Sequence, residues 1–216
     1  MALTLMKGSE AIAEAAIRAG ARFFFGYPIT PQTTLVEKLA DFVADGQSNA
    51  KYMMVESEHS AMSTCIGAEA AGCRAISATS SCGLCYMTEM LYVAASDRLP
   101  ITLAVSCRAL SGPININNDH SDAMGVRDAG WLMLFAETNQ EAYDNYLQAM
   151  RIAEAVSLPI MVCQDGFITS HAIENIELVE TEKVREILEQ EMAHAAELAV
   201  PLEVEVEEGS NWYEAH

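Results

Sequence analysis

Six short apolar segments, separated by stretches with helical spacing, constrain the fold of this chain more than any other feature. They are rich in Ala, Val, Ile, Leu, Phe and Met and cover residues 21–25, 52–55, 74–78, 101–106, 131–135 and 158–163. Near-continuous apolar strands joined by helices are typical of a parallel sheet that is covered on both faces. We therefore expect an α/β fold with a parallel sheet and helices on both faces.

The stretches between these segments predict five helices. Ser9 is a candidate cap for a helix over residues 10–19, and Gly20 is well placed to end it. Further helices are expected over residues 31–45, 60–72, 84–95 and 139–155. Residues 108–122 are dense in Asn, Gly, Pro and Asp and predict a long loop, a kind of segment that is usually functional in a compact domain.

Composition excludes several classes of function. The chain has 216 residues, a formal net charge of −19 and six cysteines. Such an acidic chain is not expected to bind nucleic acid, because phosphate contacts need Lys and Arg. There is no membrane-length apolar stretch and no signal peptide, and the scattered cysteines suggest no disulfide framework. We expect a cytoplasmic protein that has no membrane partner.

A change in composition predicts the domain organisation. Residues 1–171 are expected to form the α/β domain, and residues 172–216 an acidic C-terminal extension. The extension contains 13 Glu, no Asp, one Lys and one Arg, a net charge of −11. It could be a solvated tail or an arm that contacts a partner, with a helix over residues 181–198 and an edge strand over residues 200–206.

The turn after the first apolar segment is the first candidate site. Gly26 ends the segment, and Pro28 and Pro31 then restrict the backbone on either side of Thr30. In an open α/β sheet, ligands bind beyond the carboxyl ends of the strands. The turn alone is nevertheless more typical of a loop whose threonine caps the next helix.

Two charged residues also follow apolar segments directly. Glu58 is succeeded by a stretch of Ala, Gly, Ser and Met that offers its charge little solvation, which favours a carboxyl group that keeps its proton. It could equally be an acid placed at a helix N-terminus. Arg108 needs an anionic partner, for which Asp119, Asp122 and a ligand carboxylate are candidates. A structural ion pair is the more common arrangement.

Cysteine and histidine spacing does not predict a metal site in this chain. Cys82 and Cys85 form a single Cys-x-x-Cys pair, which cannot complete a tetrahedral zinc site. The pair could be a redox site, but we expect two small core residues. Of the five histidines, His59, His120 and His171 follow three different elements.

A set of motifs, in order along the chain, resembles a known family. The segments concerned are 27–31 (Tyr-Pro-Ile-Thr-Pro), 57–58 (Ser-Glu), 78–84 (Ala-Thr-Ser-Ser-x-Gly-Leu), 108–115 (Arg-Ala-Leu-Ser-x-Pro-Ile-Asn), 118–122 (Asn-Asp-His-x-Asp), 127–131 (Arg-Asp-x-Gly-Trp) and 165–171 (Asp-Gly-Phe-x-x-Ser-His). Residues 5–175 thereby resemble the α subunit of thiamine diphosphate-dependent 2-oxoacid:ferredoxin oxidoreductases, most similarly the multi-subunit pyruvate and 2-oxoisovalerate types.

The resemblance implies the thiamine diphosphate pyrimidine-binding fold and a shared active site. In the family, the glutamate at the position of Glu58 hydrogen-bonds N1′ of the cofactor's pyrimidine. Thr30 would lie beside the reacting carbon, and Arg108 would bind the substrate carboxylate. The residues expected to bind the cofactor are Pro28, Ile29, Glu58, Ser81 and Cys82.

The rest of the expected enzyme lies on partner subunits. A β subunit would carry the diphosphate-binding motif and Mg²⁺, and iron–sulfur and γ-type subunits would carry [4Fe-4S] clusters. Coenzyme A would accept the acyl group and ferredoxin the electrons. Cys82 departs from the glutamine common in relatives, and the second α/β domain of the family's α chain is missing from this sequence.

Two other functions remain open. The chain could be the pyrimidine-domain subunit of a split non-oxidative thiamine diphosphate-dependent 2-oxoacid decarboxylase, which needs no clusters. It could also be a non-catalytic scaffold, although Thr30, Glu58 and Arg108 are all retained.

Overall fold

The computed structural model describes residues 2–117 and 119–179, and the helix and strand expected within residues 181–206 lie outside these ranges. The chain divides into two compact units, of which Leu5–Ile176 is the larger, and the expected domain boundary after residue 171 falls inside it. The strands are β1 Ala2–Lys7, β2 Phe23–Gly26, β3 Lys51–Met54, β4 Ala75–Thr79, β5 Thr102–Cys107, β6 Leu132–Ala136, β7 Ile160–Asp165 and β8 Ile173–Leu178. The helices are α1 Gly8–Arg18, α2 Thr33–Ala44, α3 Glu58–Ala70, α4 Ser81–Tyr86, α5 Thr88–Ser96, α6 Ser121–Gly125, α7 Asn139–Val156 and α8 Ile168–His171.

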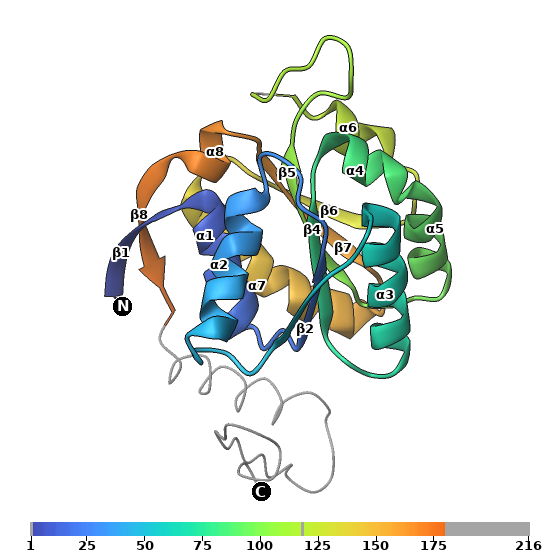
Figure 1. Ribbon diagram of the computed structural model, residues 1–216, viewed down its shortest axis with the longest axis horizontal. Coiled ribbons are helices and arrows are strands. Elements are labelled where there is room, and N and C mark those ends of the chain that lie inside the picture. Colours follow the sequence, from blue (N-terminus) through green and yellow to red (C-terminus); the bar gives the residue numbers. More distant parts are fainter. Residues whose placement is uncertain (1, 118, 180–216) are drawn as a thin grey trace, which may run out of the picture. The chain divides into compact units, whose positions relative to one another are not determined.

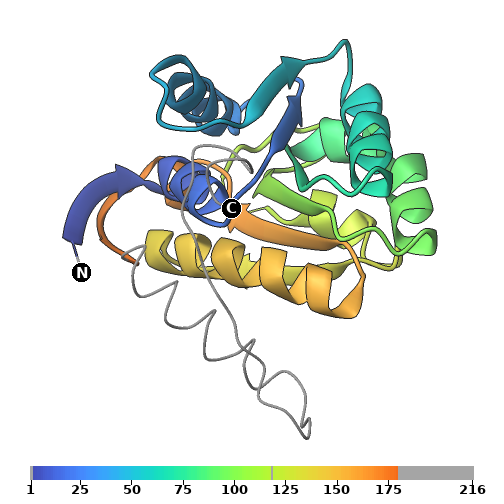
Figure 2. The same cartoon turned by 90° about the horizontal axis from the view of Figure 1, so that it is seen from below.

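Six strands form one parallel sheet in the order β3-β2-β4-β5-β7-β6, which confirms the predicted α/β class. Helices α1, α2 and α7 lie on one face, and α3, α4 and α5 on the other (Figures 1 and 2). All residues of β4, β5 and β7 are buried. Burial on both faces explains why these strands are apolar without alternation.

Local sequence places most element boundaries within a few residues, with two corrections. Helix α1 begins at Gly8 with Lys7 at the N-cap, so the expected Ser9 cap is wrong. The backbone N–H of Lys7 donates to Glu10 Oε2 at 2.9 Å, which satisfies this end of the helix. The single helix expected over residues 84–95 is two helices, because the chain turns at Met87 between α4 and α5.

Two strands were not expected from the sequence. β1 and β8 pair with each other in a separate two-stranded sheet. Polar residues interrupt the sequences of β1 (Ala-Leu-Thr-Leu-Met-Lys) and β8 (Ile-Glu-Asn-Ile-Glu-Leu), so neither strand has a continuous apolar run that would reveal it. None of the helices in the described part of the chain combines the length and apolar character that a membrane span requires.

Glu69 in the last turns of α3 predicts a pH-dependent stability. Its Oε1 accepts the Ala75 N–H at 2.7 Å, and burial raises the pKa of this carboxyl to about 7. Because the folded-state pKa lies above the ordinary value of 4.5, Glu69 favours folding at low pH. That contribution is lost as the pH rises towards and through 7.

We therefore expect Glu69→Gln to stabilise the protein at pH 8 and to have little effect at pH 5. Glutamine keeps an acceptor for the Ala75 N–H and carries no charge to bury. Allowing for partial exposure of the side chain, the gain should be about 1 kcal/mol, or about 2–4 °C in melting temperature. Thermal unfolding at both pH values measures it, with the exposed Glu137→Gln as control. An equal shift at both pH values would contradict the assignment.

Candidate active site at the carboxyl edge of the sheet

The predicted site residues all follow strands of the parallel sheet. Thr30 comes after β2, Glu58 after β3, Ser81 and Cys82 after β4, and Arg108 after β5. The carboxyl ends of parallel strands meet at one edge, so the fold brings these residues to the same side of the sheet. The chain passes from β2 outward to β3 and then back to β4 on the other side of β2, which makes this a topological switch point where α/β proteins bind ligands.

Glu58 is positioned by the start of α3. Ser57 caps the helix, its Oγ accepting the Ser60 N–H at 3.1 Å, and Glu58 is the first helical residue. Its side chain is 8% exposed and points towards Gly83 at the start of α4. A Cβ on Gly83 would lie 2.7 Å from Glu58 Oε1 and 2.5 Å from Thr79 Oγ1. The Glu58 carboxyl and the Thr79 hydroxyl therefore both lie against Gly83, where a side chain would not fit.

Thr79 is a polar residue of this site that the sequence interpretation missed. It is the last residue of β4 and is fully buried, and its Oγ1 has no hydrogen-bond partner in the described part of the chain. A buried unpaired hydroxyl is costly and is typical of a position completed by a ligand or ordered water. Thr79 lies within the Ala-Thr-Ser-Ser-x-Gly-Leu segment, so the motif contained a signal, but nothing in it distinguished Thr79 from Ser80 or Ser81.

We predict that Gly83→Ala destabilises the protein by about 1–3 kcal/mol, because the new methyl group forces Glu58 and Thr79 apart. Gly67→Ala is a matched control, since Gly67 is exposed within α3 and a Cβ there meets no atom within 4 Å. That control should gain about 0.5–1 kcal/mol through its better helix propensity. Urea unfolding measures both, and a neutral Gly83→Ala would show that the close approach is absent in solution.

Arg108 forms an ion pair with neither Asp119 nor Asp122, its two candidate partners within the described residues. Its backbone N–H donates to Asp122 Oδ2 at 3.1 Å, while Asp119 Oδ1 accepts the Ser121 N–H at 2.8 Å. The Arg108 Nε is buried and has no partner among the described residues. Both carboxylates instead accept hydrogen bonds from backbone amides.

Asp122 joins two turns of the site. Its Oδ2 accepts the Ser81 N–H at 2.8 Å and the Arg108 N–H at 3.1 Å, and Ala123 N–H donates to its Oδ1 at 2.7 Å. Burial raises the pKa of Asp122, and these three N–H groups oppose the rise. The carboxylate thus ties the turn after β4 to the loop after β5.

Ser81 also links the turn after β4 to the loop after β5. It adopts a positive φ of 46°, and its hydroxyl donates to the Ala109 carbonyl at 2.6 Å. Because the hydroxyl proton is already donated to this carbonyl, Ser81 can only accept a hydrogen bond from a ligand.

Thr30 does not cap the following helix, as its turn alone had suggested. Helix α2 begins at Thr33 with Gln32 at the N-cap and without a side-chain cap. Gln32 instead braces the turn, because its Nε2 donates to the Tyr27 carbonyl at 3.1 Å and its N–H to the Ile29 carbonyl at 3.0 Å. Thr30 is exposed, and so is Pro28, whereas Ile29 is half-buried.

The turn after β7 closes against the Thr30 turn. A Cβ on Gly166 would come within 3.0 Å of Pro31 Cγ and 3.1 Å of the Ile116 carbonyl, and it would clash with the Cys107 carbonyl. Only glycine lets these three segments approach so closely. Gly166 therefore helps to hold the Thr30 turn next to the loop that carries Arg108.

Cys82 and Cys85 are exposed, so the expectation that they are small core residues is wrong. Helix α4 buries Ser81, Gly83 and Leu84 instead, which leaves the two cysteines on its outer side. Among the described residues, no group of three His, Cys, Asp or Glu side chains is arranged to hold a metal ion.

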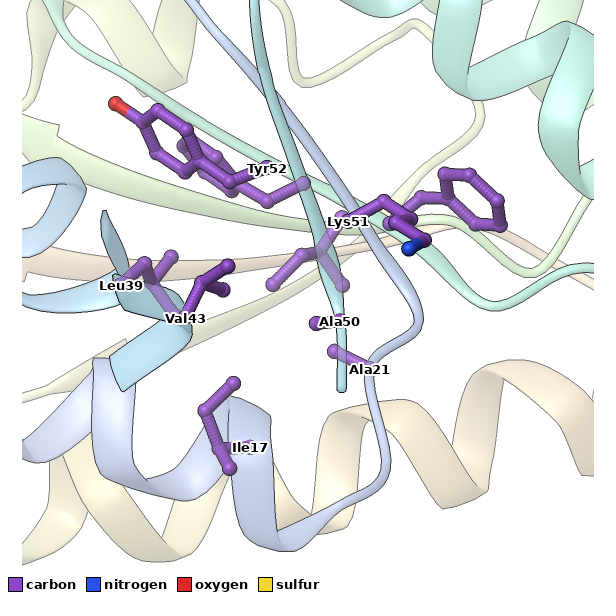
Figure 3. A pocket seen from close by; sticks show the side chains of 10 residues that line it. Ile17, Ala21, Leu39, Val43, Ala50, Lys51 and Tyr52 are labelled. Atoms are coloured by element: carbon purple, nitrogen blue, oxygen red, sulfur yellow. The ribbon is translucent and has the colours of Figure 1, made fainter. Parts of the chain in front are cut away.

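A small pocket elsewhere in the fold is unconnected with these residues. It is lined mainly by apolar side chains from α1, α2 and the amino ends of β2, β3 and β4 (Figure 3). The lining residues are Ile17, Ala21, Phe23, Phe24, Leu39, Val43, Ala50, Lys51, Tyr52 and Ile76. It lies at the start of these strands, opposite the edge that carries Glu58 and Arg108. Among the residues that line it, only Lys51 and Tyr52 have titratable side chains.

Comparison with known proteins agrees with this architecture. The pyruvate synthase subunit PorA of Methanocaldococcus jannaschii is 54% identical over 186 residues, covering 85% of this chain and 48% of the relative. The ketoisovalerate oxidoreductase subunit VorA of Pyrococcus horikoshii is 45% identical over 184 residues, covering 85% and 47%. The chain thus spans about half the length of the curated relatives it matches.

A solved structure and a family model give the same result. A 2-oxoglutarate:ferredoxin oxidoreductase from Magnetococcus marinus, with 2-oxoglutarate, coenzyme A and succinyl-CoA bound, superposes with a TM-score of 0.76 at 25% identity, covering 84% of this chain and 32% of that one. The model "Pyruvate flavodoxin/ferredoxin oxidoreductase, thiamine diP-bdg" matches residues 14–214, which is further towards the C-terminus than the motifs reach. The chain therefore belongs to the family of thiamine diphosphate-binding domains of pyruvate flavodoxin/ferredoxin oxidoreductases.

Proposed function

We propose that this chain is the pyrimidine-binding part of a 2-oxoacid:ferredoxin oxidoreductase that converts pyruvate or a branched-chain 2-oxoacid to acyl-CoA and CO₂. The observation that carries the proposal is the buried Glu58 carboxyl beside the unpaired Thr79 hydroxyl and the bare Gly83. The names of the relatives give the substrate class, since they are subunits of pyruvate synthase and ketoisovalerate oxidoreductase.

The residues at this edge fit the pyrimidine end of thiamine diphosphate. Glu58 supplies a carboxyl that can share a proton with a ring nitrogen, and Thr79 supplies a hydroxyl with free hydrogen-bonding capacity. Gly83 leaves open the space that a side chain would fill. Pro28, Ile29, Ser81 and Cys82 complete the proposed cofactor contacts. When bound, thiamine diphosphate supplies the carbon nucleophile for 2-oxoacid decarboxylation, and the protein orients it and tunes its protonation.

Glu58 holds a proton at the cofactor, and Arg108 and Thr30 act on the substrate. The buried Nε of Arg108 has hydrogen-bonding capacity that a carboxylate of the 2-oxoacid would use. The exposed Thr30 hydroxyl lies on a turn held against the Arg108 loop through Pro31 and Gly166. Together they would fix the carboxylate end of the substrate relative to the reacting carbon.

The remaining groups of the reaction are assigned to partner subunits. The chain has no Gly-Asp-Gly segment of the kind that binds diphosphate and Mg²⁺, so a β subunit would hold both. Iron–sulfur and γ-type subunits would hold the [4Fe-4S] clusters, with ferredoxin as electron acceptor and coenzyme A as acyl acceptor. The chain alone should be inactive.

Purification of the chain with its native partners tests the proposal. We expect bound iron, and reduction of a viologen dye that requires pyruvate or 2-oxoisovalerate together with coenzyme A. Thiamine-dependent release of CO₂ without iron or dye reduction would instead establish the split non-oxidative decarboxylase. Absence of both activities in a complete, cofactor-loaded complex would leave only the non-catalytic scaffold.

A further inference from the structure

The proposed reaction gives Cys82 a cofactor contact but leaves Cys85, and the pairing of the two thiols, without a role. Both side chains are exposed on α4, whereas Cys65, Cys107 and Cys163 are buried and Cys73 is half-buried. Residues three apart on a helix have Cβ atoms about 5–6 Å apart, and a disulfide needs about 3.5–4.5 Å. A small backbone adjustment in this six-residue helix would therefore allow the two sulfurs to bond.

The two thiols have different surroundings. Cys82 Sγ lies 3.5 Å from Ser111 Oγ and 3.8 Å from Ser81 Oγ. Hydrogen bonds from the side chain and backbone of Ser111, together with the Arg108 charge, lower the pKa of the Cys82 thiol. Partial burial and the neighbouring Cys82 raise the pKa of Cys85. Cys82 is therefore the more readily deprotonated thiol and the better nucleophile, and Cys85 loses its proton less readily.

We propose that Cys82 and Cys85 form an oxidant-sensitive dithiol, with Cys82 as the attacking residue and Cys85 as the resolving residue. The oxidant is a hydroperoxide. The Cys82 thiolate attacks its terminal oxygen, the S–O bond forms and the O–O bond breaks, and the departing oxygen takes up a proton as alcohol or water. Cys85 then attacks the sulfenic sulfur, the S–S bond forms, and water leaves with the oxygen and the Cys85 proton. The two cysteines lose two electrons, and the hydroperoxide gains them.

The disulfide changes a contact between two parts of the site edge. In the reduced form, the Cys82 Sγ faces Ser111, which lies on the loop that also carries Arg108. Bonding to Cys85 turns the sulfur away from Ser111 and removes that contact. If the proposed function is correct, turnover of the 2-oxoacid falls with oxidation and returns with a dithiol reductant.

The test measures the mass of the peptides that contain Cys82 and Cys85 rather than enzyme activity, so its result does not depend on the proposed function. The full chain, purified with its accompanying subunits, is exposed to hydrogen peroxide, alkylated with N-ethylmaleimide, and digested for mass spectrometry. We expect a peptide with Cys82 and Cys85 linked, lighter by two hydrogens and restored by dithiothreitol. Before oxidation, Cys82 should be alkylated at least about threefold faster than Cys73 at pH 7, because the thiolate is the reacting form.

Three variants separate the two roles. Cys85→Ser should stop oxidation at a Cys82 sulfenic acid that a dimedone probe captures, while Cys82→Ser should abolish both capture and disulfide. Cys73→Ser, at a half-buried cysteine away from α4, should leave the disulfide unchanged. The proposal is overturned if Cys82 is protected from both reagents in the complex, reacts no faster than Cys73, or proceeds to sulfinic acid without forming the disulfide while Cys85 is present.

Discussion

Glu58→Gln should abolish turnover of the assembled complex, with a fall in kcat of at least about a hundredfold. Glutamine has nearly the same shape, so it fills the same space against Gly83 and Thr79. It cannot give and take a proton as a carboxyl group does, and the proposed reaction needs that exchange at the cofactor ring. The measurement is 2-oxoacid-dependent viologen reduction by the complex reconstituted with thiamine diphosphate and its partner subunits.

Glu56→Gln provides a matched control for this result. Glu56 lies two residues earlier, is exposed, and accepts a hydrogen bond from Ser60 Oγ at 2.7 Å. Its replacement should change turnover by less than about twofold, as is usual for surface positions. Near-normal activity of Glu58→Gln, in a complex with full cofactor content, would refute the catalytic role of Glu58.

Arg108→Lys should raise the KM for the 2-oxoacid by about ten- to hundredfold, with a smaller effect on kcat. Lysine keeps the charge but loses the planar group whose Nε is buried and unpaired among the described residues. Loss of a charge-assisted hydrogen bond of about 1.5–3 kcal/mol corresponds to roughly ten- to hundredfold in affinity. Initial rates over a range of pyruvate and 2-oxoisovalerate concentrations separate KM from kcat.

Arg127→Lys is the control for Arg108→Lys. The Arg127 side chain is 68% exposed and lies near the charged Asp128 at the surface. We expect unchanged kinetic constants for this variant. If Arg108→Lys reduced kcat and left KM unchanged, Arg108 would stabilise the reacting groups rather than bind the substrate carboxylate.

The sequence predicts individual elements and their ends well, because that information is local. Continuous apolar runs identify the buried strands β4, β5 and β7, and the residues that follow the strands place Thr30, Glu58 and Arg108 at one edge. A parallel sheet makes this inference possible, since all its strands end on the same side. Among the strands of the described residues, β1 and β8 were missed, because polar residues interrupt both sequences.

Contacts between distant residues were decided by the tertiary structure alone. Asp122 binds the amide of Ser81, 41 residues away, and thereby joins the turns after β4 and β5 instead of neutralising the Arg108 guanidinium. Whether a small residue such as Cys82 is buried depends on which side of α4 meets its neighbours, and no spacing rule shows that for so short a helix. The sequence by itself determined the α/β class and the edge of the sheet at which the candidate site residues lie. The structure decided which polar groups at that edge are already hydrogen-bonded and which remain unpaired, because partners for buried groups come from wherever the strand order places them.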